Sequence, residues 1–135
     1  MVLDPIDPDA WGADFATDDP AVFLDTFWKS ANCMVFVDEA GDNFGRFETD
    51  MAQCATKGRH SGHCLHFISQ RAKMLSPTVR TQCTKLVLFN VAYEDAKMHS
   101  VEWNRPQLLT CVDFPPGIYF ECGRWGVLQK GDCFT

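Results

Sequence analysis

The chain has 135 residues, 46% of them hydrophobic, and a formal net charge of −6 at pH 7. A chain of this length predicts one domain with one hydrophobic core, spanning residues 1–135. The negative charge excludes a protein that coats nucleic acid over its whole surface, and no stretch reaches the ~20 apolar residues of a membrane span.

Seven cysteines are present, an odd number, and most of them lie inside apolar runs. A free cysteine in such a run behaves as a small hydrophobe, so we expect buried thiols rather than a disulfide scaffold. The first residues lack the basic and apolar regions of a signal peptide. Together these features predict a cytoplasmic protein that does not contact a membrane.

The first predicted elements are a short strand at residues 2–4, a loop up to residue 19 and a helix over residues 20–30. Pro20 suits the first turn of that helix, and Asp18 or Asp19 can cap it. Apolar side chains at Val22, Phe23 and the positions that follow then supply a helical apolar face.

The next predicted strand, residues 34–37, is an unbroken apolar run that leads into Asp38 and Glu39. A buried parallel strand reads in this way, and open α/β sheets place their chemistry at the carboxyl ends of such strands. In nucleoside triphosphatases this pattern is the Walker B strand, whose aspartate holds the Mg²⁺ shell while a neighbouring glutamate activates the attacking water. The alternative is a core strand that ends in a solvated turn.

The remaining elements alternate between strand and helix. We expect a turn at residues 41–45, a helix at 47–57 that Gly58 stops, strands at 63–69 and 85–91, helices at 77–82 and 94–103, a short helix that Pro106 opens, and a terminal hairpin at 117–129. This order predicts an α/β fold: a mostly parallel sheet, flanked by helices, to which the hairpin adds an antiparallel edge.

Polar residues also end the strand predicted at residues 63–69, where Ser69, Gln70 and Arg71 follow the apolar run. A polar side chain at the tip of the strand beside Walker B is where such ATPases place a sensor of the γ-phosphate or of the attacking water. The alternative is a glutamine that simply faces solvent.

Charge is distributed unevenly along the chain. Residues 1–50 hold twelve acidic and two basic residues, whereas residues 51–93 hold no acid, six bases and three histidines. The central segment predicts a local face for phosphate or for the DNA backbone; the alternative is a basic half that neutralises the acidic half. The face would comprise Lys57, Arg59, Arg71, Lys73 and Arg80.

A zinc site is not expected, although cysteines and histidines are frequent between residues 54 and 66. Within a strand Cys64 faces away from both His63 and His66, and the chain has no C-x₂-C pair.

The order of these motifs resembles the FtsK/HerA group of P-loop motor ATPases, which includes Zot-like proteins and phage genome-packaging ATPases. The resemblance covers roughly residues 1–122. It rests on the strand 34–38 with Glu39, on Gly58-Arg-His-Ser-Gly62, on Ile68-Ser-Gln-Arg71, and on the segment 76–82 before the strand at 86–89.

The resemblance implies roles for individual residues. It implies that Asp38 is the metal-shell aspartate, Glu39 the catalytic glutamate and Gln70 the sensor, with ATP and Mg²⁺ as cofactors. Arg80, and after it Arg71, are the candidates for an arginine that meets phosphate.

The chain contains no G-x-x-x-x-G-K-[ST] motif, so the phosphate cradle, its lysine and its hydroxyl are missing. We therefore expect the Walker B and sensor half of an ATP-driven DNA translocation or packaging motor, active only with a P-loop supplied elsewhere. We expect a homo-oligomer, or a partner chain that completes the sheet, with DNA as a further candidate partner. The alternative function is a non-catalytic interaction module or regulator from a phage or mobile element, which keeps the sheet and binds a partner protein.

Overall fold

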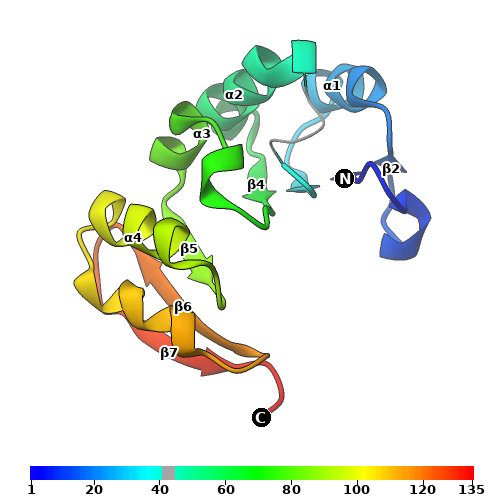
Figure 1. Cartoon of the computed structure of the whole chain (residues 1–135). Coiled ribbons are helices and arrows are strands. Elements are labelled where there is room, and N and C mark those ends of the chain that lie inside the picture. Colours follow the sequence, from blue (N-terminus) through cyan, green and yellow to red (C-terminus); the bar gives the residue numbers. More distant parts are fainter. Residues whose placement is uncertain (41–44) are drawn as a thin grey trace. The chain divides into compact units, whose positions relative to one another are not determined.

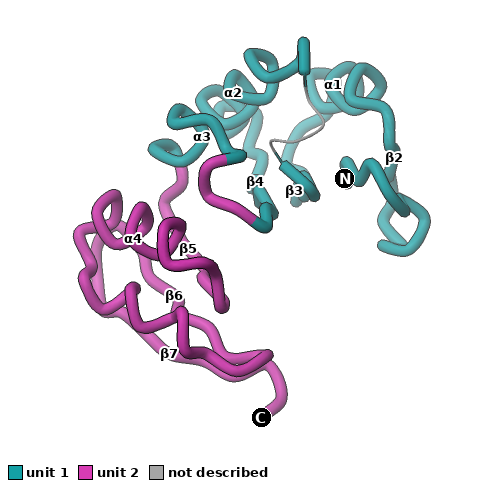
Figure 2. The backbone as a smooth tube through the Cα atoms, viewed as in Figure 1, with its two compact units in different colours: residues 1–70, 74–82 teal, residues 71–73, 83–135 magenta. Residues whose placement is uncertain are grey.

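The computed structural model describes residues 1–40 and 45–135, so most of the turn predicted at residues 41–45 lies outside the described residues. The chain forms two compact units, drawn in teal and magenta in Figure 2. Unit 1 comprises Met1–Gln70 and Met74–Gln82, and unit 2 comprises Arg71–Lys73 and Cys83–Thr135. Each unit has its own core, and the single domain stays a prediction.

Unit 1 is built on a parallel sheet with the strand order β2-β1-β3-β4. Its strands are β1 (Val2–Leu3), β2 (Ala16–Thr17), β3 (Met34–Val37) and β4 (Cys64–Phe67). The strands β3 and β4 pair in register from Met34 opposite Cys64 to Val37 opposite Phe67. Their carboxyl ends therefore lie side by side. The strand β2 falls inside the predicted loop, because its pairing with β1 could not be read from local sequence.

Two helices of unit 1, α1 (Pro20–Lys29) and α2 (Glu48–Lys57), lie on the same face of this sheet (Figure 1). Their apolar side chains pack against β3 in one core, in which Phe23, Phe27 and Val35 are fully buried. A third helix, α3 (Pro77–Gln82), has the predicted bounds. Short 3-10 turns span Pro8–Trp11, Gly45–Phe47, Gly58–Ser61 and Ala72–Met74.

Local signals set the ends of these helices, with one difference from expectation. The Asp19 carboxylate accepts a hydrogen bond from Ala21 N–H at 2.8 Å, as predicted for the cap of α1. Gly58 follows the last residue of α2, but its φ of −58° is right-handed, and Gly62, at φ +74°, is the left-handed residue that ends the following turn. Gly58 is needed for space instead: a Cβ there would lie 2.8 Å from Phe27 Cζ.

Unit 2 holds an antiparallel sheet of β5 (Lys85–Leu88), β6 (Ile118–Gly123) and β7 (Gln129–Asp132). Helix α4 (Tyr93–Glu102) and the 3-10 helix Pro106–Asp113 supply the rest of its core. The terminal hairpin is present, with its return strand beginning at Gln129. The strand at residues 85–88 was expected in the parallel sheet, but it pairs antiparallel with β6, because a neighbouring hairpin strand offers it complementary backbone groups.

The fold class is thus α/β, with a four-stranded parallel sheet flanked by helices and a separate three-stranded antiparallel sheet. Among the helices of the described residues, none combines the length and the hydropathy that a membrane crossing requires.

Candidate functional site

The turn after β3 carries the two predicted carboxylates. Asp38 N–H donates to Leu3 C=O of β1 at 2.9 Å, and Ala40 N–H donates to Ile68 C=O beyond β4 at 2.8 Å. Between these anchors, Glu39 N–H donates to the Asp38 carboxylate at 2.9 Å. Hydrogen bonds to both neighbouring strands therefore hold this turn at the carboxyl edge of the sheet.

Glu39 has a φ of +48°, in the left-handed region that few residues other than glycine adopt. Such a conformation costs of order 1–3 kcal/mol and persists only when the surrounding structure holds it in place. Residues strained in this way cluster at active sites and ligand clamps. The strain marks Glu39 as a functional candidate independently of its sequence motif.

The structure brings Glu39 together with Gln70, which is 31 residues further along the chain. Gln70 Nε2 donates to Glu39 Oε1 at 2.9 Å, across the adjacent ends of β3 and β4. Both Asp38 and Glu39 are half-buried, and Gln70 is exposed. Two carboxylates and a carboxamide thus converge where open α/β sheets bind ligands.

Asp38 and Glu39 supply the hard oxygen donors that Mg²⁺ prefers. Mg²⁺ in nucleotide sites is held jointly by one or two carboxylates and the substrate phosphates. The donor set therefore fits one side of a Mg·ATP site, with Asp38 as the residue that would hold the metal shell.

A third strand end, at β1, carries an acidic residue that is not among the predicted site residues. Asp4 is buried, and its carboxylate accepts hydrogen bonds from Ile6 N–H at 2.8 Å, Asp7 N–H at 3.2 Å and Trp11 Nε1 at 2.8 Å. The bond from the Ile6 backbone, the largest effect, lowers the pKa of Asp4. The Asp-Pro turn signal at residues 4–5 could have indicated this structural role.

Replacing Asp4 with asparagine should destabilise unit 1 by about 2 kcal/mol at pH 7, the scale of hydrogen bonds to a charged group. Because its pKa is lowered on folding, Asp4 contributes stability above the unfolded value of about 3.9, and this contribution is lost as pH falls through the folded pKa. Urea unfolding should therefore show a difference between wild type and Asp4→Asn that shrinks at pH 3. Asp9→Asn, at an exposed position of the following turn, is the control and should match wild type. An equal difference at both pH values would contradict this account.

The two candidate arginines both have partners within their own units. Arg71 Nε lies 3.4 Å from Asp95 Oδ2 in unit 2, and the Asp95 side chain is only 2% exposed. Arg80 Nη1 donates to Leu75 C=O at 2.6 Å in unit 1. Each arginine therefore has a structural contact besides its predicted role toward phosphate.

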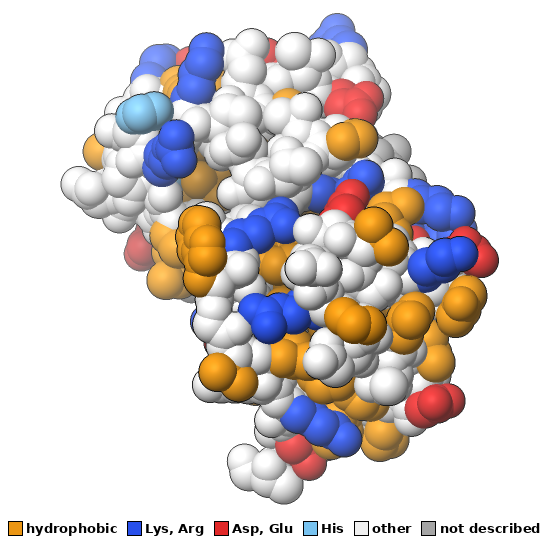
Figure 3. All heavy atoms as spheres, turned by 90° about the vertical axis from the view of Figure 1, so that its left-hand side faces the viewer, with side chains coloured by type: hydrophobic (Ala, Val, Ile, Leu, Met, Phe, Trp, Pro, Cys, Tyr) orange, Lys and Arg blue, Asp and Glu red, His pale blue; other side chains and the backbone are white. Residues whose placement is uncertain are grey.

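The predicted anion face divides between the units. Lys57 and Arg59 are exposed at the end of α2 and in the turn after it, in unit 1, and Lys73 is exposed in unit 2. On the face shown in Figure 3, lysine and arginine side chains stand at the surface among uncharged and hydrophobic ones. The anion face stays a prediction.

The histidines within the predicted zinc segment serve packing. Cys33 N–H donates to His63 Nδ1 at 3.2 Å, so His63 Nε2 carries the proton and donates to Phe27 C=O at 3.1 Å. The His66 ring stacks on Phe36 with centroids 4.5 Å apart. Among the described residues, no group of three or more histidine, cysteine or acidic side chains is placed to hold a metal ion.

All seven cysteines are free thiols. Burial raises the pKa of Cys54 to about 12, and it raises the pKa of Cys83, Cys111 and Cys122 as well. These four thiols are therefore protonated at neutral pH and make poor nucleophiles.

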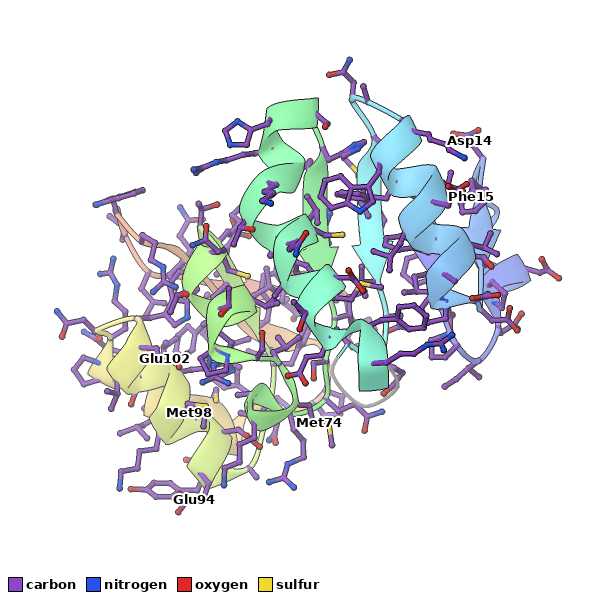
Figure 4. All side chains as sticks on the ribbon, turned by 90° about the horizontal axis from the view of Figure 1, so that it is seen from above. Asp14, Phe15, Met74, Glu94, Met98 and Glu102 are labelled. Atoms are coloured by element: carbon purple, nitrogen blue, oxygen red, sulfur yellow. The ribbon has the colours of Figure 1, made fainter. Side chains whose placement is uncertain are left out.

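A groove of about 530 Å³ lies at the opposite end of the sheet, around the amino ends of β1 and β3. Asp14 and Phe15, which help to line it, lie beside α1 (Figure 4). The groove includes none of the predicted site residues. We place the site at the carboxyl edge, because the strained turn and the convergent polar groups are there.

Comparisons with solved structures find the same fold in a viral protein, the genome packaging NTPase B204 from Sulfolobus turreted icosahedral virus 2. Its complex with AMPPCP matches with a TM-score of 0.67 at 13% identity, covering 84% of this chain and 62% of that chain. Its complex with ATP-gammaS matches with a TM-score of 0.68 at 12% identity, covering 88% of this chain and 64% of that chain.

At this identity the likeness shows the fold alone, which is the P-loop NTPase-like fold expected from the sequence. The chain spans less than two thirds of the length of B204 in both comparisons. No protein-family model matches the chain, and no curated protein does.

Proposed function

We propose that this chain is the Walker B and sensor half of the ATPase core of a DNA-packaging or DNA-translocation motor of the FtsK/HerA type. The observation that carries the proposal is the hydrogen bond between Glu39 and Gln70, made by a strained residue at the carboxyl ends of adjacent parallel strands. The fold shared with a packaging NTPase supports it. That likeness does not favour the alternative of a non-catalytic module.

Each residue has a distinct task in this proposal. Asp38 holds the Mg²⁺ shell, Glu39 accepts a proton from the attacking water, and Gln70 orients Glu39 and the water. Asp38 is already oriented by the Glu39 amide, and Glu39 by the Gln70 amide, so neither carboxylate requires reorganisation before reaction. Bound ATP and Mg²⁺ would supply the reactive phosphate and the neutralising charge.

The isolated chain should neither bind nor hydrolyse ATP appreciably. Phosphate positioning supplies most of the catalysis in this chemistry, and the sequence has no G-x-x-x-x-G-K-[ST] loop to hold the phosphates. Isothermal titration calorimetry of the pure chain with Mg·ATP checks this, and micromolar binding would contradict it. A strand–loop–helix segment that carries the motif, added in trans or fused, should restore hydrolysis. A chain that stays inactive in both forms would argue against the proposed function.

We also propose DNA as the translocated partner, bound by the acid-free segment. Replacing Lys57, Arg59 and Lys73 together with alanine should weaken DNA binding and lower the salt slope by about 0.9 for each phosphate that is no longer neutralised. These three residues are exposed, whereas replacing Arg71 or Arg80 would also remove structural contacts. Fluorescence anisotropy at several salt concentrations measures both quantities. Lys29, Lys97 and Lys130, exposed and outside this segment, form the control triple, and equal effects of the two triples would rule the face out.

The cytoplasmic location belongs to the same proposal, and the seven free thiols support it, because disulfides are rare in reducing compartments. An oligomer, or a partner that completes the sheet, is likewise proposed rather than observed.

A further inference from the structure

The parallel sheet of unit 1 ends in two unlike edge strands. At one edge, β2 is only two residues long and offers little backbone for pairing. At the other edge, β4 has four residues, Cys-Leu-His-Phe, with no proline, lysine or acidic residue. Natural edge strands are usually protected by such residues, by bulges or by shortness. The β4 edge has none of these protections, so it is the edge at which this sheet can be extended.

The backbone of β4 has hydrogen-bonding groups that face its open side. Cys64 N–H donates to Cys33 C=O at 3.0 Å, and Ile68 N–H donates to Val37 C=O at 2.9 Å, so the even-numbered residues pair with β3. Since successive residues of a strand point their backbone groups to opposite edges, those of Leu65 and Phe67 point away from β3. No described strand pairs with that side of β4.

One face of the same sheet is also open near β3 and β4. Leu65 and Phe67 pack into the core beneath α1 and α2. By alternation Met34 and Ile68 lie on the other face, where they are 59% and 41% exposed. Parallel sheets are found almost only with both faces covered. The open edge and the open face together indicate that a strand and a covering helix are absent from residues 1–135.

We propose that the partner is a segment consisting of an apolar strand, a glycine-rich phosphate-binding loop and a helix, in that order. This inference rests on the proposed function. The strand adds in parallel to the open edge of β4, and the helix covers Met34 and Ile68.

The position of the site selects this partner. A parallel neighbour of β4 ends at the same edge of the sheet as Gln70, so the loop that follows it reaches the phosphates beside Glu39 and Gln70. An antiparallel strand would place its loop at the opposite end. A second copy of this chain cannot be the partner, because its sequence also lacks the phosphate-binding motif.

Amide hydrogen exchange on the full chain tests the docking. The probe is a synthetic segment of about 30 residues with an apolar strand, a G-x-x-x-x-G-K-[ST] loop and a helix. With the probe in excess and no nucleotide, the Leu65 and Phe67 amides should exchange at least about tenfold more slowly. The Cys64 amide, already bonded to β3, should change little. Unchanged exchange at Leu65 and Phe67 would overturn the proposal.

Two matched variants test the edge itself. Cys64→Lys places a charge on an exposed position of β4 and should weaken probe binding by about tenfold or more. Val101→Lys, at a position of α4 that is 73% exposed, should bind like wild type. Equal binding by the two variants would place the contact elsewhere. Protection of Leu65 and Phe67 that grows with the concentration of the chain alone would identify a second copy as the occupant, and so would overturn the proposal.

The two proposals fail in different ways. If the probe protects β4 but the complex does not hydrolyse ATP, the docking site stands and the proposed function fails. If ATP is hydrolysed while β4 stays unprotected, the proposed function stands and the docking site is wrong.

Discussion

Replacing Glu39 with glutamine is expected to lower ATP hydrolysis about 10²–10⁴-fold in the chain complemented with a phosphate-binding segment, the scale of a lost general base. Glutamine has the same length, and its carbonyl oxygen can still accept the hydrogen bond from Gln70 Nε2. It cannot take a proton from water. The change should therefore act on kcat, with little effect on nucleotide binding or on stability.

Single-turnover kinetics with a parallel measurement of nucleotide affinity separates these effects. The matched control is Glu94→Gln, on exposed α4 (Figure 4), which should keep wild-type turnover. Gln70→Ala should have a smaller effect than Glu39→Gln, because Gln70 orients groups and transfers no proton. Full activity of Glu39→Gln would show that another residue activates the water.

Replacing Arg71 with methionine is expected to destabilise unit 2 by about 3 kcal/mol, near the low end for breaking a buried ion pair because the guanidinium is half-exposed. The variant leaves the Asp95 carboxylate buried without its cation. One of its oxygens, Oδ1, already has no hydrogen-bond partner among the described residues. Chemical denaturation of the full chain measures the loss, and Lys73→Met, two residues away and exposed, is the control.

The double variant Arg71→Met/Asp95→Leu separates structure from chemistry. Apolar replacement of a buried pair is often neutral or stabilising, so the double variant should recover most of the lost stability. If its complemented form is as active as wild type, Arg71 is structural only. If stability returns while hydrolysis stays low, Arg71 meets phosphate as the resemblance implies. A stable single variant would mean that the pair with Asp95 contributes little.

Several elements followed from local sequence. Asp19 and Pro20 start α1, because a carboxylate cap and a proline satisfy the first turn without help from the rest of the chain. The apolar run at residues 34–37 could only be a buried strand, and its following carboxylates had to lie at a sheet edge. Parallel pairing of β3 with β4 then brought Glu39 to Gln70, so the centre of the candidate site could be predicted from the order of the motifs.

Other features depended on residues far apart in the chain. Nothing local to Ala16–Thr17 predicts a strand, since it exists only by pairing with β1, and the antiparallel partner of β5 lies more than thirty residues away in β6. Asp95 gains its importance from Arg71, 24 residues earlier, and Gly58 from the ring of Phe27. Local sequence thus determined caps, apolar runs and strand-end polar groups, since neighbouring residues satisfy them. Strand partners, buried pairs and close packing were decided by tertiary structure, because their free energy comes from contacts that exist only after distant segments meet.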